Sequence, residues 1–374
     1  MLIGIEASRA NRLQKTGVEW YAYRLIQAMK QDPMQDPHAW ILYSNTALSM
    51  GLERMPTNWH ERRLSWAPKY LWTQIRLSLE MLRKPPEVLF VPAHVLPRFA
   101  PKRSVVTVHD VGFHKYPELY KPRQVSYHEW STKDIVKSGA KIITVSEFCK
   151  GEIMEGYNVP ADRITVTPLG VDHATYKPAD ASVITSTLAR LQIPTPYVLF
   201  VGRLEAKKNI LVLVDAFKRH KASRGVGDPL HLVLAGLPGE GFDAIGKAIA
   251  DSGCAEFVHI TGYLSEADKV ALLSGALAYV QPSFYEGFGL PPLEAMACGS
   301  PVISSNAASL PEVVGEGNAL FFDPLDPEAL RAHLETILDQ SETRDRLRTA
   351  GLAWAPRFRW DKTARQTLQT LTTW

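Results

Sequence analysis

Short runs of apolar residues alternate with longer helix-forming stretches along the whole chain. In the first half the runs are LIGIE (2–6), WILYS (40–44), EVLFV (87–91), VVTV (105–108), IITV (142–145) and ITVTP (164–168). In the second half they are YVLFV (197–201), HLVLA (231–235), FVHIT (257–261), LAYVQP (277–282), PVISS (301–305) and ALFF (319–322). Runs that are apolar throughout predict strands buried on both faces, as in parallel sheets. Because such strands alternate with helices, we expect an α/β protein with a doubly wound, Rossmann-like domain in each half.

A chain of 374 residues is long for one domain, and its length favours two. The halves are separated by HATYKPADASVITSTLARLQIPTP (173–196), which contains three prolines and no expected strand. We therefore expect an N-terminal domain over 1–175, a linker over 176–196 and a second domain over 197–355, followed by a last segment, 356–374. Ligands of open α/β sheets bind beyond the carboxyl ends of the strands, so a site is expected in the loops there, in a cleft between the domains.

Composition and charge exclude several classes of protein. No apolar run approaches the ~20 residues of a membrane-spanning helix, and MLIGIEASRA leads into a strand without the apolar core of a signal peptide. The cysteines Cys149, Cys254 and Cys298 lie far apart in no metal-like spacing, which fits a reduced, cytoplasmic compartment. Residues 1–180 hold 24 Lys+Arg and 18 Asp+Glu, or +6, and the remainder 18 and 21, or −3. This excess is too mild for a nucleic-acid partner but suits an anionic partner or membrane surface.

Two carboxylates are separated by seven residues in SFYEGFGLPPLEAMACGSPVI (283–303). Pro292 suits the first position of a short helix and Gly299 its C-terminal cap, which places Glu294 in the first turn and Glu286 in the loop before it. Glycines in that loop let a ligand approach the backbone N–H groups at a helix N-terminus, an arrangement that binds anions. An acid there would compete with a phosphate unless it faces hydroxyl groups, as on a sugar or a ribose. A first-turn acid that only favours the helix dipole remains an alternative for Glu294.

Three cations follow the strand YVLFV, in GRLEAKKN (202–209). Arg203, Lys207 and Lys208 precede a helix that we expect to begin near Asn209. Cations at a helix N-terminus oppose the helix dipole, so their presence indicates an anion between them and the helix. A diphosphate fits, since arginine can bind it through two donors. A solvated charge cluster is the alternative.

Three other loops carry candidate residues. His109 ends the strand VVTV in the first half, where it either serves the site or is structural, with Asp110 orienting its ring. Ser146 is expected to cap the helix after IITV. Gly17 is expected in a loop before an amphipathic helix, where a substrate could approach its backbone.

Together these residues resemble the retaining glycosyltransferases of the GT-B fold called family 4, or glycosyl transferases group 1. EGFGLPPLE is similar to the family's E-x7-E signature, VGRLEAKKN to its diphosphate clamp, and HD at 109–110 to its active-site histidine. VTPLGVD (166–172) resembles the segment beside the hinge, with Leu169 where the family usually has Asn. The resemblance spans the chain to FRWDKTARQTL and implies that the final helix returns to the N-terminal domain.

The resemblance also implies a role for each matching residue. Glu294 would bind the ribose hydroxyls, Glu286 the hydroxyls of the donor sugar, and His109 the sugar from the other domain. Arg203 and Lys208 would neutralise the departing diphosphate. The remaining donor contacts would come from Gly17, Gly202, Tyr263, Leu264, Gly287, Phe288, Gly289 and Leu290, with the nucleotide base near Tyr263 and Leu264 and Gly17 near the donor phosphate or the acceptor.

The resemblance thus predicts a retaining transferase that moves a hexosyl group, with mannosyl from GDP-mannose favoured over a UDP-sugar, to a glycan or lipid-linked acceptor without a metal ion. A nucleotide-sugar 2-epimerase and a catalytically silent nucleotide-sugar-binding subunit are the rivals. The acceptor could lie at a membrane, because KYLWTQIRLSLEMLRK (69–84) spaces Lys69, Arg76 and Arg83 by seven and places Trp72, Ile75, Leu79 and Leu82 on an apolar face. Such a helix could make peripheral contact with the inner face of the membrane, but an ordinary core-facing helix explains the same pattern and is favoured.

Overall fold

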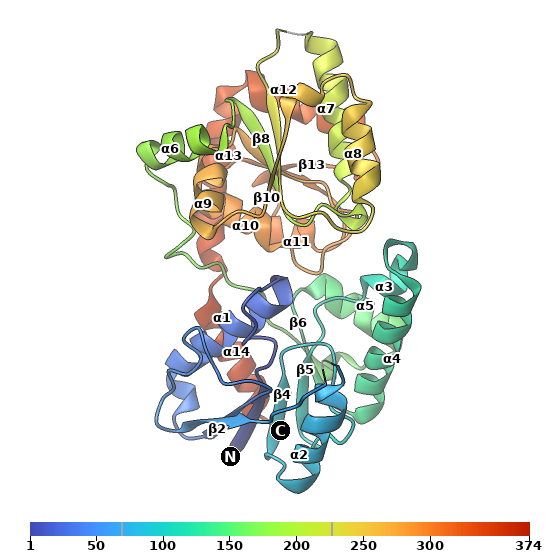
Figure 1. Cartoon of the computed structure of the whole chain (residues 1–374), viewed down its shortest axis with the longest axis vertical. Coiled ribbons are helices and arrows are strands. Elements are labelled where there is room, and N and C mark those ends of the chain that lie inside the picture. Colours follow the sequence, from blue (N-terminus) through green and yellow to red (C-terminus); the bar gives the residue numbers. More distant parts are fainter. Residues whose placement is uncertain (69, 226) are drawn as a thin grey trace. The chain divides into compact units, whose positions relative to one another are not determined.

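The computed structural model describes residues 1–68, 70–225 and 227–374, and these form two compact units. One unit comprises Met1–Gly170 together with Arg359–Trp374, and the other comprises Val171–Phe358. Each contains one parallel sheet flanked by helices (Figure 1). The segment expected as a linker, 176–196, lies in the second unit and contains helix α6, which is stabilised by packing on α9.

Unit 1 has, among the described residues, a seven-stranded sheet in the order β3-β2-β1-β4-β5-β6-β7, with every neighbouring pair parallel. Its strands are β1 (Leu2–Glu6), β2 (Ala39–Ser44), β3 (Trp59–Arg63), β4 (Val88–Val91), β5 (Ser104–Thr107), β6 (Lys141–Thr144) and β7 (Ile164–Val166). Every residue of β4 and β5 is buried, as the uninterrupted apolar runs predict. The edge strand β3 (WHERR) was not expected, because Trp59 is its one buried residue. Its indole stacks on Trp40 of β2 at a centroid distance of 4.8 Å.

The helices of unit 1 cover both faces of this sheet. They are α1 (Gly17–Gln31), α2 (Ser78–Arg83), α3 (Gly112–Lys115), α4 (Pro122–Ser138), α5 (Glu147–Tyr157) and α14 (Trp360–Thr372). Ser146 caps α5 as expected, since its hydroxyl accepts a hydrogen bond from the Cys149 N–H at 3.1 Å. Gly17 is the first residue of α1 rather than a loop residue, because Thr16 and Glu19 form a capping box that starts the helix there.

The C-terminal helix α14 returns to unit 1 and packs on α1, which confirms the expected crossing. Its residues Ala364, Leu368 and Leu371 are fully buried in the same core as Leu25. The chain approaches itself closely at this crossing. A Cβ atom on Gly170 would lie 2.2 Å from the Trp360 nitrogen, so a glycine is required there.

The amphipathic segment before β4 has two apolar faces. A π-helical turn (Trp72–Leu77) leads into α2. Trp72 faces the core, as the core-facing interpretation predicts, because its Nε1 donates to the Leu64 carbonyl at 2.8 Å and its ring packs among buried side chains. By contrast, Ile75, Leu79 and Leu82 are exposed on the other face. Lys69, the first residue of the expected cationic row, lies outside the described residues.

Unit 2 has, within its described residues, a six-stranded sheet in the order β10-β9-β8-β11-β12-β13, again parallel throughout. Its strands are β8 (Tyr197–Val201), β9 (His231–Ala235), β10 (Val258–Gly262), β11 (Ala278–Gln281), β12 (Val302–Ser305) and β13 (Ala319–Phe322). Its helices are α6 (Ala181–Leu191), α7 (Ile210–Arg224), α8 (Phe242–Ala250), α9 (Glu266–Gly275), α10 (Leu290–Ala297), α11 (Leu310–Val314), α12 (Pro327–Asp339) and α13 (Ser341–Trp354).

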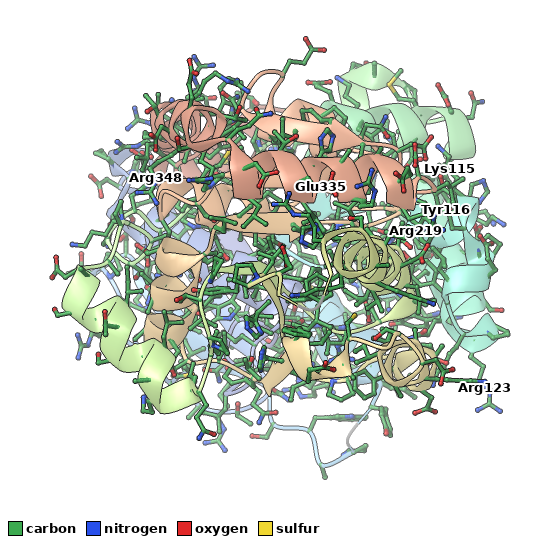
Figure 2. The ribbon with its side chains drawn as sticks, turned by 90° about the horizontal axis from the view of Figure 1, so that it is seen from above. Lys115, Tyr116, Arg123, Arg219, Glu335 and Arg348 are labelled. Carbon is green, nitrogen blue, oxygen red and sulfur yellow. The ribbon has the colours of Figure 1, made fainter. Side chains whose placement is uncertain are left out.

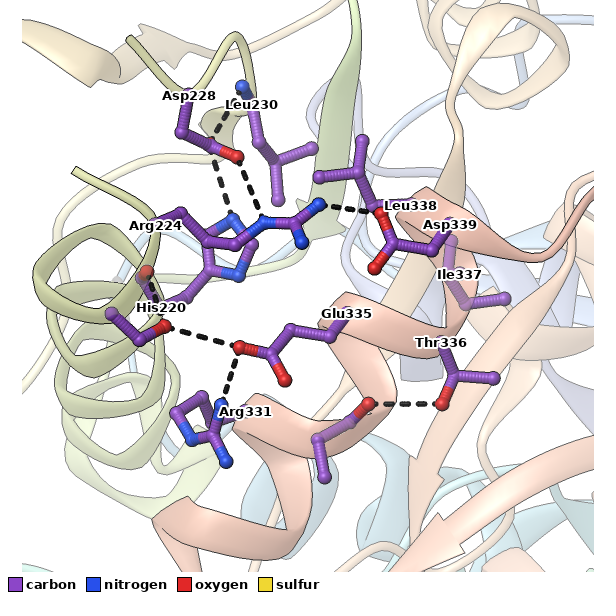
Figure 3. A network of polar contacts seen from close by, with 12 residues as sticks. His220, Arg224, Asp228, Leu230, Arg331, Glu335, Thr336, Ile337, Leu338 and Asp339 are labelled. Carbon is purple, nitrogen blue, oxygen red and sulfur yellow. Dashed lines mark hydrogen bonds and ion pairs between the residues drawn. The ribbon is translucent and has the colours of Figure 1, made fainter. Parts of the chain in front are cut away.

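Helices α7 and α12 pack side by side on one face of this sheet and carry Arg219 and Glu335 (Figure 2). A polar network lies around Asp228, whose Oδ1 accepts a hydrogen bond from His220 Nε2 at 3.1 Å (Figure 3). Lys221 Nζ donates to the same oxygen, also at 3.1 Å. His220 is fully buried, so this network anchors the end of α7. The opposite end of α7 faces the loops that follow β8 and β11, which are neighbours in the sheet.

Candidate functional site

Glu286 follows β11 and is surrounded by donors. Its Oε1 accepts hydrogen bonds from Lys208 Nζ at 2.6 Å, Ser283 Oγ at 2.7 Å and Gln281 Nε2 at 2.8 Å. Burial raises the pKa of Glu286, but the charges of Lys208 and Lys207 and the donated hydrogen bonds outweigh it and lower that pKa below its usual value. The side chain is therefore an ionised carboxylate, and among the described residues all its hydrogen bonds go to one oxygen. Oε2 remains available to a ligand.

The loop after β8 brings the cations to Glu286 because β8 and β11 are adjacent strands. A 3-10 turn, Ala206–Lys208, precedes Asn209, which is the N-cap of α7 as expected. The Lys207 carbonyl accepts a hydrogen bond from the Phe284 N–H at 3.2 Å, and this bond joins the two loops.

Arg203 lies in the same loop with an exposed side chain. Its Cγ and Cδ pack so closely on Gly239 that a Cβ there would lie 2.7 and 2.9 Å from them. Among the described residues its guanidinium makes no ion pair. The backbone of Gly202 packs directly against Gly236, since a Cβ on Gly236 would lie 1.7 Å from the Gly202 carbonyl oxygen. The loop thus presents a supported backbone and an uncompensated cation.

The glycine-rich loop after Glu286 leads into α10, which begins earlier than expected. Gly289 is the N-cap with φ +98°, a conformation that favours glycine, and Leu290 is the first helical residue. Pro292 is consequently the third residue of α10, not the first, and Glu294 lies in the second turn, not the first. This position excludes the dipole explanation of Glu294, because the dipole acts mainly in the first turn. Gly299, with φ +79°, ends the helix as expected.

Ser309, just before α11, fixes this loop and was not found from the sequence. Its hydroxyl lies 2.8 Å from the Glu286 carbonyl and 3.0 Å from the Phe288 carbonyl, as a shared donor to both. The Ser305 hydroxyl likewise donates to the Ser283 carbonyl at 2.7 Å. These hydrogen bonds to backbone carbonyls fix the conformation of the loop.

Glu294 is nearly buried and belongs to a separate polar cluster in the same unit. Lys269 Nζ on α9 donates to its Oε2 at 3.3 Å. Burial and the nearby Glu266 raise the pKa of Glu294, and Lys269 opposes both. Two further predicted residues, Tyr263 and Leu264, follow β10. Tyr263 exposes 70% of its surface, so its ring is open to a stacking partner.

Unit 1 contains the candidate residues His109 and Gly17. His109 follows β5, and its Nε2 lies 3.3 Å from the Pro92 carbonyl while its ring meets Tyr21 edge-on at 4.5 Å. Burial lowers the pKa of His109 more than the Pro92 carbonyl and Asp110 raise it, so the imidazole is neutral near pH 7. Asp110 Oδ1 accepts from the Gly112 N–H at 3.1 Å. Around Gly17 a Cβ would meet nothing within 4 Å, so its backbone is open to approach.

The described residues contain no group of three or more His, Cys, Asp or Glu side chains placed to hold a metal ion. None of the helices formed by these residues has both the length and the apolar character to span a bilayer.

Known proteins resemble this chain in sequence and in fold. The family descriptions "Glycosyltransferase Family 4" and "Glycosyl transferases group 1" match residues 15–175 and 189–354. The chain is 36% identical over 268 residues to O-antigen chain mannosyltransferase B of Escherichia coli, which covers 71% of this chain and 69% of that one. A sucrose-phosphate synthase of Thermosynechococcus elongatus has a similar structure, with a TM-score of 0.76 at 20% identity over 99% of this chain and 98% of that one. The structure of HepE of Anabaena in complex with UDP-glucose is also similar, with a TM-score of 0.75 at 18% identity over 99% of each chain. The predicted fold class is confirmed.

Proposed function

The chain belongs to glycosyltransferase family 4, the glycosyl transferases group 1, and from this premise we propose that it moves a mannosyl group from a nucleoside-diphosphate sugar to a glycan or lipid-linked acceptor in surface polysaccharide synthesis. The family and the GT-B fold establish a glycosyltransferase. The choice of mannose rests on the similarity to the O-antigen mannosyltransferase, and GDP-mannose is the donor that we favour. The similar structure of HepE holds UDP-glucose, so a UDP-sugar is the alternative to test.

The observation that carries the proposal is the ionised Glu286 bonded to Lys208 at the ends of two adjacent strands. A carboxylate with a free oxygen accepts hydrogen bonds from sugar hydroxyls, and the cation beside it attracts a phosphate. The two ligand groups that a nucleotide sugar joins, a hydroxyl-rich ring and a diphosphate, are matched by neighbouring side chains. Glu294, eight residues further on, is proposed to accept the ribose hydroxyls.

The proposed chemistry follows from how charge develops during transfer. As the bond between the anomeric carbon and the phosphate oxygen breaks, negative charge grows on the diphosphate and positive charge on the sugar ring. Lys208, Arg203 and the N-terminus of α10 would stabilise the negative charge on the diphosphate, without reorganisation at the moment of reaction. Glu286 would stabilise the positive charge on the sugar ring and also hold the ring in place. This arrangement supplies positive charge without needing a metal ion, and the family resemblance implies retention of anomeric configuration.

We place the acceptor at a membrane surface. Beside Ile75 and Leu79, the segment exposes Tyr70 (73%), Leu71 (61%) and Leu82 (58%), an apolar row along one side of α2 and the turn before it. Exposed apolar rows of this kind, when flanked by cations, bind the interface of anionic bilayers. Arg83 and Lys84 supply exposed cations here. Arg76 does not, because Glu80 neutralises it at 3.3 Å.

The experiment that tests the proposal begins with the nucleotide. The purified chain is titrated with GDP, UDP and ADP in the presence of EDTA, and the unfolding temperature is followed. We expect one nucleotide to raise it saturably in the wild type and in Arg219→Ala, an exposed arginine of α7, and to lose effect in Arg203→Ala. No shift with any nucleotide at millimolar concentration would reject a nucleotide-sugar donor. Transfer from the matching sugar donor to extracted glycolipid is then measured, and conversion of the donor without acceptor would indicate an epimerase instead.

A further inference from the structure

Glu294 is linked to a distant part of unit 2 by a chain of polar contacts. Lys269 Nζ lies 3.3 Å from Glu294 Oε2 and also 3.3 Å from Glu266 Oε1. The Tyr176 hydroxyl donates a hydrogen bond to the other oxygen of Glu266. Lys269 Nζ also lies 4.7 Å from the centroid of the Tyr176 ring, within the range of a cation–π contact. Lys269 of α9 therefore connects the segment around Tyr176 to the Glu294 carboxylate on α10.

The ammonium of Lys269 is enclosed, and so is the carboxylate that it contacts. Their side chains are 17% and 11% exposed. Taking a cation out of water is costly unless opposite charges surround it, and here Glu266 and Glu294 do so. Burial lowers the pKa of Lys269, but the two carboxylates outweigh it and raise that pKa, so the lysine stays charged throughout the physiological range.

No second cation faces Glu294 among the described residues. The Tyr176 hydroxyl, from the segment before α6, lowers the pKa of Glu294 by hydrogen bonding, while the Tyr279 hydroxyl faces it from β11 and the Cys298 thiol from α10 itself. These three groups are neutral near pH 7, since burial raises the pKa of Cys298 to about 12 and those of Tyr176 and Tyr279 well above their usual value. Glu266 adds a second negative charge nearby. Without Lys269, Glu294 would be an acid with a negative neighbour and no compensating charge, and it would take up a proton.

We propose that Lys269 is a positioning residue of the donor site, which holds Glu294 as a charged, oriented acceptor for two neighbouring ribose hydroxyls. The inference rests on the proposed function of Glu294. A carboxylate accepts from both hydroxyls of a vicinal diol, whereas a protonated acid uses one oxygen as a donor and cannot. Lys269 contacts Oε2 of Glu294 from α9 and so fixes the orientation of the carboxylate. Tyr176 and Glu266 in turn fix the lysine.

The test is nucleotide affinity as a function of pH. Calorimetric titration with GDP, or with whichever nucleoside diphosphate stabilises the wild type, is run from pH 6 to pH 9 for the wild type, Lys269→Met and Lys269→Arg. Lys218→Met, which changes an exposed lysine of α7, is the matched control. We expect Lys269→Met to bind about tenfold more weakly than the wild type at pH 6, the factor that follows when Glu294 is about nine-tenths protonated in the variant and ionised in the wild type, and to approach the wild type at pH 9. Lys269→Arg, which keeps the charge, should restore most of the affinity.

Equal weakening at every pH, with no rescue by arginine, would show a merely structural lysine and overturn the proposal, and so would unchanged affinity at pH 6. A second readout needs no ligand. Because the unneutralised Glu294 costs stability only when it is ionised, Lys269→Met should lower the unfolding temperature more at pH 8 than at pH 5. If the wild type bound no nucleotide, the proposed function would fail, while this difference would still decide whether Lys269 governs the charge of Glu294.

Discussion

Replacing Glu286 by glutamine removes one negative charge while leaving the length and shape of the side chain almost unchanged. In the wild type a single oxygen, Oε1, receives Lys208, Ser283 and Gln281, with donor–acceptor distances between 2.6 and 2.8 Å. The glutamine can still accept from these donors through its carbonyl, but its amide must take the place of Oε2 and donates where the carboxylate accepts. The change therefore reverses the hydrogen-bonding character of the atom that we assign to the sugar.

The expected loss can be estimated from these contacts. A hydrogen bond to a charged group is worth about 1.5–3 kcal/mol, so losing one or two bonds to sugar hydroxyls weakens transition-state binding by about 3 kcal/mol. At 1.36 kcal/mol for each factor of ten, kcat/KM should fall about a hundredfold or more. The stability cost is smaller. Lys208 loses its counter-charge but is 18% exposed and can turn towards water, so about 1–2 kcal/mol is expected, less than the ~3–5 kcal/mol for breaking a fully buried pair.

The assay measures initial rates of transfer together with urea unfolding of the same preparations. Glu286→Asp, which keeps the charge on a shorter side chain, is the comparison, and Glu342→Gln, a carboxyl-to-amide change at an exposed position of α13, is the control. We expect the glutamine variant to lose transfer while remaining folded, and the aspartate variant to retain more. Transfer at the wild-type rate by a folded Glu286→Gln protein would refute the role of the carboxylate.

Three other changes test separate parts of the structure. Asp228→Asn removes the charge at the centre of the buried network with His220 and should destabilise unit 2 by about 3 kcal/mol in urea unfolding without altering nucleotide affinity. Folding lowers the pKa of both Asp228 and His220. The wild type should therefore lose stability as the pH falls below about 6.5, where His220 protonates on unfolding, and further below about 4, where Asp228 does. Gly170→Ala would force a Cβ against the backbone of Trp360 and should cost about 2 kcal/mol or more, whereas Gly151→Ala in the middle of α5, where nothing lies within 4 Å, should be neutral or stabilising; equal stability of both variants would contradict the crossing geometry. Leu79→Ser combined with Leu82→Ser should weaken binding to phosphatidylglycerol vesicles about tenfold or more, as expected for the loss of two apolar side chains from the contact. Leu352→Ser on α13, the control, should leave vesicle binding unchanged. Undiminished vesicle binding by the double variant would remove the membrane contact from the proposal.

The parts of the fold that the sequence predicted are those where one strong signal acts alone. Strands such as β4 and β8 are continuous apolar runs, and burial on both faces is the one environment that suits them. The edge strand β3 gave no such signal, because four of its five residues are polar or charged and its place depends on one indole stacked on another strand. Helix α6 was hidden by the prolines on either side of it.

The candidate site shows a similar division. Glu286, Arg203 and Lys208 were found because they belong to compact motifs directly after strands. Ser309 and Lys269 were missed because they act from other elements, and no local pattern indicates that a hydroxyl or an ammonium will meet a carboxylate many residues away. The start of α10 was misplaced because Pro292 suits a first helical position, whereas the left-handed backbone of Gly289 starts the helix two residues earlier, at Leu290.

The division of the chain into units has a consequence for its synthesis. Unit 2 is continuous from Val171 to Phe358, whereas unit 1 needs residues from both before and after it. On the ribosome, unit 2 can complete its core while unit 1 still lacks Ala364, Leu368 and Leu371, which emerge later and fill the space beside α1. The N-terminal part of the newly made chain must therefore wait with an uncovered apolar face, the condition in which aggregation and chaperone binding are most favoured. The first part to be translated is the last to be finished.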